Sequence, residues 1–146
     1  MREEKIITIY TTAVKPGLAI TPFMTPDPII VSKEYPCSGS FYLTAIMYFE
    51  REKKYTTELD VVFNGESVLP DISSNQEQLQ TFMFSPVNEK YVVVGTYLFV
   101  KNIKLIETGT YDIIYRIFEG IDGNLSEVID EKKCALISTT TNRDKE

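Results

Sequence analysis

The residue types that carry most protein chemistry are sparse in this sequence. It contains no histidine, which excludes Ser-His-Asp and Cys-His mechanisms and histidine-based metal sites. Its two cysteines are far apart and cannot form a Cys-only zinc site within one chain. No glycine-rich phosphate loop is present, because the candidate glycines stand apart in the sequence. We therefore predict no metal site, no cofactor and no enzymatic activity.

Paired carboxylates are the remaining catalytic option. Glu58 and Asp60 would lie on one face of a strand, about 7 Å apart at the backbone, and such a pair could serve glycoside hydrolysis. Asp122-Gly123-Asn124, together with Asp130 and Glu131, could form a loose calcium loop, although the calcium-hand spacing is not met. We favour a solvated strand face for the first group and a tight turn before a polar strand for the second.

Tyrosine gives the clearest functional signal. The chain has nine Tyr, eight Phe and no Trp. Exposed tyrosines supply rigid amphipathic area at protein interfaces, whereas tyrosines that cap a core turn their hydroxyls toward water or backbone. Four rings, three in predicted strands and one directly before a predicted strand, fit either interpretation. We take them as candidate protein-binding residues: Tyr42, Tyr48, Tyr91 and Tyr97.

Composition and charge describe an acidic protein of one domain. Its 146 residues suit a single domain, which we place at 1–138, followed by a flexible C-terminal tail at 139–146. The net charge of −6 works against binding to nucleic acid or anionic lipid. No secretory signal or membrane span is visible. We therefore expect a cytoplasmic protein in which Cys37 and Cys134 are reduced thiols.

Alternation of apolar and polar residues predicts antiparallel strands. An apolar run at 92–100 suits a central strand, where Gly95 marks a bulge or a close approach, and the pattern slips at Lys101-Asn102, which predicts a second bulge. Asn64-Gly65 predicts a tight turn. The segment 16–28 is expected to be a proline-rich connection and 70–78 to hold a short helical turn. Strands are expected at 6–14, 29–31, 41–50, 55–64, 67–69, 79–84, 92–100, 110–119 and 127–137.

The fold class that follows is all-β: an antiparallel two-sheet β-sandwich of eight or nine strands. One pairing can be tested on paper. If the strand 41–50 pairs directly with the strand 55–64, a five-residue loop places Phe49 opposite Tyr55 and gathers the apolar side chains on one face. This register applies only if the two strands share a sheet.

One short segment resembles a known family. Glu107-Thr108-Gly109-Thr110-Tyr111-Asp112-Ile113 is similar to the corner before strand F of immunoglobulin-like domains. The resemblance implies that Tyr111 is a tyrosine corner whose hydroxyl bonds to upstream backbone, and that Ile113 occupies the place of the second disulfide cysteine. Leu105 would face the core. The usual core Trp is absent, so the resemblance implies an immunoglobulin-like sandwich in the broad sense and not an antibody-type or receptor domain.

These observations favour a non-enzymatic protein-binding module, of the accessory, inhibitor or immunity type, from a bacterium or phage. The partner would be another protein or a second copy of the chain. The strand face that carries Tyr42 and Tyr48 is too apolar for an ordinary solvated surface, so we expect one or both rings at the rim of a contact. A carbohydrate-binding sandwich is the alternative, weakened by the missing Trp platform, and an enzyme using paired carboxylates ranks third.

Overall fold

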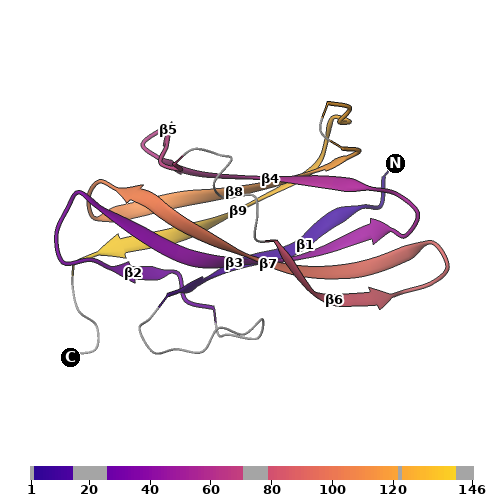
Figure 1. Cartoon of the computed structure of the whole chain (residues 1–146), viewed down its shortest axis with the longest axis horizontal. Helices are drawn as coiled ribbons and strands as arrows, with labels where there is room; N and C mark the ends of the chain where they lie inside the picture. Colours follow the sequence, from indigo (N-terminus) through magenta and orange to yellow (C-terminus); the bar gives the residue numbers. More distant parts are fainter. Residues whose placement is uncertain (1, 15–25, 71–78, 122, 141–146) are drawn as a thin grey trace.

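Nine β-strands in two sheets make up the described part of the molecule (Figure 1). The computed structural model describes residues 2–14, 26–70, 79–121 and 123–140. These ranges contain no helix, and the predicted all-β sandwich is confirmed. The strands are β1 (Lys5–Ala13), β2 (Ile29–Val31), β3 (Cys37–Glu50), β4 (Tyr55–Phe63), β5 (Glu66–Ser67), β6 (Gln80–Pro86), β7 (Tyr91–Leu105), β8 (Gly109–Glu119) and β9 (Val128–Thr139).

The strands divide into a four-stranded and a five-stranded sheet. The first has the order β1-β3-β7-β6 and the second the order β2-β9-β8-β4-β5. All neighbouring pairs are antiparallel except β2, which runs parallel to β9. Figure 1 shows β4 and β8 in the upper layer and β3, β7 and β6 in the lower one. The longest strands, β3 and β7, form the centre of the four-stranded sheet.

The strands 41–50 and 55–64 do not pair directly, so the condition for the register proposed for them is not met. β3 pairs with β1 and β7, and β4 pairs with β8 and β5, so the two strands belong to different sheets. The loop after β3 carries the chain from one layer to the other. The two apolar faces still meet, but across the sandwich, where the rings of Phe49 and Tyr55 stack with centroids 3.9 Å apart. Local alternation predicted which side chains point inward, while the hydrogen-bonding partners came from distant strands.

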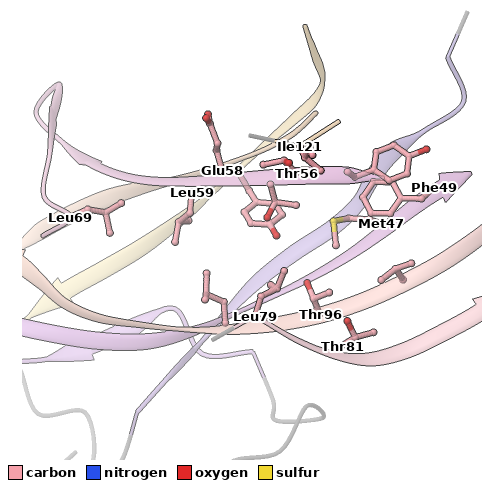
Figure 2. Close-up of a pocket in the computed structure, with 15 residues that line it drawn as sticks. Met47, Phe49, Thr56, Glu58, Leu59, Leu69, Leu79, Thr81, Thr96 and Ile121 are labelled. Atoms are coloured by element: carbon pink, nitrogen blue, oxygen red, sulfur yellow. The ribbon is translucent and has the colours of Figure 1, made fainter. Parts of the chain in front are cut away.

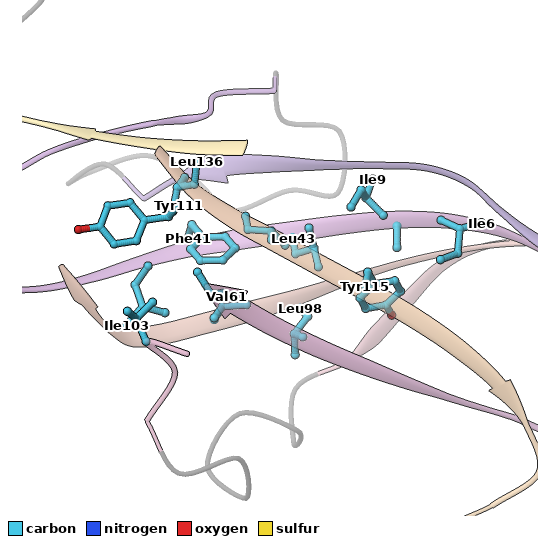
Figure 3. Packing of buried hydrophobic residues seen from close by; sticks show 14 of the residues in the cluster. Ile6, Ile9, Phe41, Leu43, Val61, Leu98, Ile103, Tyr111, Tyr115 and Leu136 are labelled. Atoms are coloured by element: carbon cyan, nitrogen blue, oxygen red, sulfur yellow. The ribbon is translucent and has the colours of Figure 1, made fainter. Parts of the chain in front are cut away.

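The core lies between the inward faces of the two sheets (Figure 3). On β3 the face that alternation marked as apolar is buried throughout, and β8 contributes a facing row. Figure 3 shows Phe41 and Leu43 in the same cluster as the rings of Tyr111 and Tyr115. Fully buried side chains of these two strands include Phe41, Leu43, Met47, Tyr111, Ile113, Tyr115 and Ile117.

Both predicted irregularities of β7 are present. The pairing of β6 with β7 shifts opposite Gly95, where both Phe82 and Met83 meet a single residue. A Cβ at Gly95 would lie 2.8 Å from Cζ of Phe82, so the close approach requires glycine. A second shift, between β3 and β7, leaves an extra residue at Lys101-Asn102, and Asn102 has a φ of 60°.

The tyrosine corner has the hydrogen bonds that its sequence pattern implies. The Tyr111 hydroxyl donates to the carbonyl oxygen of Glu107 at 2.8 Å and accepts from the backbone N–H groups of Ile106 (2.9 Å) and Glu107 (3.2 Å). The ring is fully buried and stacks on Phe63 with centroids 4.3 Å apart. This single side chain therefore pins the loop between β7 and β8 to the core.

The turns and ends follow the sequence closely. Asn64 and Gly65 both have positive φ, 51° and 81°, as the Asn-Gly turn requires, and the short strand that follows begins one residue earlier than predicted. β9 ends at Thr139, one residue inside the predicted tail. Three expectations concern residues outside the described ranges: most of the proline-rich connection, the short helical turn at 70–78, and the tail beyond position 140.

Candidate functional site

The four candidate tyrosines share the outer face of the four-stranded sheet. Tyr42 and Tyr48 lie on β3, where they alternate with the buried core residues, and Tyr91 and Tyr97 lie on the neighbouring strand β7. All four are half-buried. The second sheet packs against the opposite side of β3, so it does not cover these rings.

Two further rings join them in two groups. Tyr42 contacts Tyr97 with centroids 6.4 Å apart and Phe99 at 4.9 Å, and Phe82 of β6 lies 6.3 Å from Tyr97. At the other end of the face the rings of Tyr48 and Tyr91 stack at 4.8 Å. We call these six residues the aromatic face: Tyr42, Tyr48, Phe82, Tyr91, Tyr97 and Phe99. Sequence reasoning missed Phe82 and Phe99, although Phe99 keeps the alternation of Tyr97.

Cations lie beside one end of the aromatic face. The ammonium group of Lys5 lies 5.9 Å from the centroid of Tyr48, and that of Lys90 lies 5.4 Å from the centroid of Tyr91. Burial raises the pKa of Tyr42, and the neighbouring Tyr97 raises it further, so the Tyr42 hydroxyl stays a neutral donor at physiological pH. The face therefore offers flat apolar area, hydroxyl groups and two positive charges. This chemistry suits recognition of another surface.

The candidate carboxylates take part in local structure. Asp60 accepts hydrogen bonds from the Ser67 hydroxyl (2.6 Å) and the Val61 N–H (2.8 Å), which fixes the turn between β4 and β5. Its predicted partner Glu58 is exposed and lies opposite Arg116 in the ladder.

Two of the residues suggested as a calcium loop form hydrogen bonds and an ion pair with other parts of the chain. Asp130 accepts from the N–H of Ile6 at 2.8 Å, and Glu131 pairs with Arg116 at 2.6 Å. Asp122 lies outside the described residues. In the part of the chain that the structure describes, no group of three or more His, Cys, Asp or Glu side chains could hold a metal ion.

A charged cluster that the sequence did not reveal joins the two sheets at one end. Glu4 is 5% exposed; its carboxylate accepts from the Tyr55 hydroxyl at 2.9 Å and pairs with Arg2 at 3.0 Å. Arg2 also contacts Glu119 at 2.8 Å, and Lys53 contacts Glu50 at 2.7 Å.

These contacts shift the ionisation of several groups. The hydrogen bond from Arg2 lowers the pKa of Glu119, the one from Lys53 lowers the pKa of Glu50, and burial raises the pKa of Tyr55. The groups are paired with each other, and they stabilise the end of the sandwich.

A cavity between the sheets was also missed (Figure 2). It has a volume of about 510 Å³ and is lined by β3, β4, β6, β7 and β8. Figure 2 shows Leu59 of β4 on one side of the gap, with Thr96 and Thr81 on the other. The residues come from five strands and from segments between strands, so no local sequence pattern could have identified them.

Comparison with known proteins found no matching family model, no matching curated protein and no matching solved structure. The described ranges contain no helix that is long and apolar enough to cross a membrane. The aromatic face and the cavity are therefore the two features of the structure that point to a function.

Proposed function

We propose that this chain is a non-enzymatic protein-binding module whose partner docks on the aromatic face. The observation that carries the proposal is the gathering of six half-exposed rings on three neighbouring strands of one sheet, with the other sheet on the opposite side. Contiguous apolar surface of this kind marks interaction sites. Tyr and Phe lose little conformational entropy on binding and are enriched in the centres of interfaces.

Charge favours a different protein over a second copy of the chain as the partner. The chain carries a net charge of −6, and like charge opposes self-association. Lys5 and Lys90 lie against the rings of Tyr48 and Tyr91 and could attract acidic groups at the rim of a contact. The proposed partner therefore presents apolar side chains flanked by carboxylates. In this proposal the module acts in the cytoplasm of a bacterium or phage-infected cell, as an accessory, inhibitor or immunity-type protein.

We further infer that the sandwich is immunoglobulin-like. Two features support this. The order β1-β3-β7-β6 against β9-β8-β4 corresponds to the arrangement ABED against GFC, and Tyr111 at the start of β8 forms the hydrogen bonds of a tyrosine corner. The fold alone does not determine a function, so the protein-binding proposal depends on the surface and not on this likeness.

The test compares three proteins: the parent, a variant in which Tyr42 and Tyr48 are both changed to Ser, and the control Phe118→Ser. Phe118 is a half-buried ring opposite Thr56, on the outer face of the other sheet. Each protein is used to capture binding partners from its native host. We expect the parent and the control to retain one stoichiometric protein that the double variant loses, while denaturation shows all three folded.

Three outcomes would overturn the proposal. Binding to a glycan array that depends on Tyr42 and Tyr48 would indicate a carbohydrate-binding protein. A homodimer in sedimentation that the double variant abolishes would make a second copy the partner. Unfolding of the double variant, with the control folded, would assign the two rings to the core.

A further inference from the structure

We propose that the cavity between the sheets binds a small, mainly apolar molecule through one hydrogen-bond acceptor oxygen. The site is separate from the aromatic face, because the cavity lies on the inward side of β3 and β7 and the face on their outward side. The inference therefore stands or falls independently of protein binding.

Size and lining favour a small molecule. The volume of about 510 Å³ lies within the range of roughly 300–1,000 Å³ that is typical of ligand pockets. Most of the wall is aliphatic or aromatic, and its polar part consists of hydroxyl groups and the carboxylate of Glu58. Such a mixture binds apolar molecules and uses a few polar groups to orient them. The apolar lining residues are Met47, Phe49, Leu59, Leu69, Leu79, Val94, Leu98 and Ile121.

The cavity has a buried base and an exposed rim. Met47, Leu98 and Tyr115 are buried, whereas Leu79 is 43% and Ile121 60% exposed. Large apolar side chains at the rim of a cavity add contact area for an apolar ligand.

Two hydroxyl groups at the base have no partner. Neither Tyr115 Oη nor Thr96 Oγ1 forms a hydrogen bond with any described residue, although both oxygens are buried. Burial raises the pKa of Tyr115, and the neighbouring hydroxyls of Thr57 and Thr96 oppose that shift. Tyr115 is therefore a neutral donor. Buried polar groups are nearly always hydrogen-bonded in native proteins. Two unpaired donors beside one apolar cavity therefore indicate that an oxygen of a bound ligand accepts their hydrogen bonds.

The test uses two probes of the same shape. Benzophenone carries a carbonyl between two phenyl rings, and diphenylmethane carries a methylene in its place. Each is titrated into the full chain, and the methyl resonances of Leu59, Val94 and Leu98 are followed by NMR. We expect saturable shifts with both probes. Benzophenone should bind at least about tenfold more tightly, because its carbonyl oxygen can accept a hydrogen bond from each of the two buried hydroxyls.

Three variants identify the donor. In Tyr115→Phe and in Thr96→Val the preference for benzophenone should fall toward unity, while diphenylmethane still binds. Tyr97→Phe, which removes a hydroxyl on the outward face, should leave the preference unchanged. The first two changes nearly conserve side-chain volume, so we expect both variants to fold. If one of them does not, the other still measures the preference for benzophenone.

Two results would overturn the inference. If neither probe shifts the cavity resonances up to its solubility limit, the cavity holds only water or is otherwise filled. If the parent binds the two probes equally, or if Tyr115→Phe and Thr96→Val keep the full preference, the buried hydroxyls do not recognise a ligand oxygen.

Discussion

Two buried tyrosines on β8 give a sharp test of the hydrogen-bonding account. Tyr111 and Tyr115 lie four positions apart on β8, and both are almost fully buried. The Tyr111 hydroxyl forms three hydrogen bonds with the backbone of Ile106 and Glu107, whereas the Tyr115 hydroxyl forms none within the described chain. Tyr→Phe removes only the oxygen in each case, so Tyr111→Phe should lower the stability of the fold and Tyr115→Phe should not.

The size of each change in stability depends on the hydrogen bonds that are lost with the hydroxyl oxygen. Loss of a typical hydrogen bond costs about 0.5–1.5 kcal/mol. Ile106 and Glu107 are exposed residues, so water can replace part of what Tyr111 supplies. We therefore expect Tyr111→Phe to lower the free energy of unfolding by about 1–2 kcal/mol. Tyr115→Phe removes an unpaired buried hydroxyl and should cost nothing or add up to about 1 kcal/mol.

Urea denaturation measures both changes. The transition midpoint should fall for Tyr111→Phe and stay or rise for Tyr115→Phe, with the slope unchanged in both, because the surface exposed on unfolding is the same. Equal midpoints for Tyr111→Phe and the parent would remove the tyrosine corner from the account. A loss of stability in Tyr115→Phe would show that its hydroxyl has a partner in the unliganded protein.

Three further predictions concern charge and thiols. The pKa values of Glu50 and Glu119 are lowered in the folded state, so the contribution of these groups to stability is present above the unfolded value of 4.5 and should be lost as the pH falls through the lower folded values. Glu119→Gln should weaken this pH dependence of the denaturation midpoint. A pH profile identical to that of the parent would contradict the pairing of Glu119 with Arg2. Thiol titration of the unfolded protein without reductant should find two thiols, Cys37 and Cys134, and a mass two units lower with no thiols would indicate a disulfide and an oxidising compartment. In the folded protein, burial raises the pKa of Cys134 to about 11, so its reaction with a disulfide reagent at pH 8 should be far slower than in the unfolded chain; equal rates would show that the thiol is not buried.

The sequence predicted the strands well because the signals for them are local. Alternation at β3 and β8 identified the inward faces, and Asn64-Gly65 and Gly95 marked the turn and the close approach correctly. The pairing of the strands could not be predicted from local signals. The register considered for β3 and β4 does not apply, because the partners of these strands, β1, β7 and β8, lie far away in sequence.

The candidate site was predictable only in part for the same reason. Tyr42 and Tyr97 follow from alternation within single strands. Phe82 joins the aromatic face at a bulge in the pairing of β6 with β7, which strict alternation does not reveal. The cavity needs five strands to enclose it, and the buried Glu4 needs Tyr55 from the opposite sheet. Features assembled from distant segments have no local signature.

Photo-cross-linking from the aromatic face tests the central claim most directly. A p-benzoylphenylalanine is placed at Tyr97, and in a separate protein at the control position Phe118, and each is irradiated in the native host. The account predicts a discrete adduct of higher mass from position 97, formed with a protein other than the chain itself, and no such adduct from position 118. Absence of an adduct at 97, or the same adduct from both positions, would contradict it.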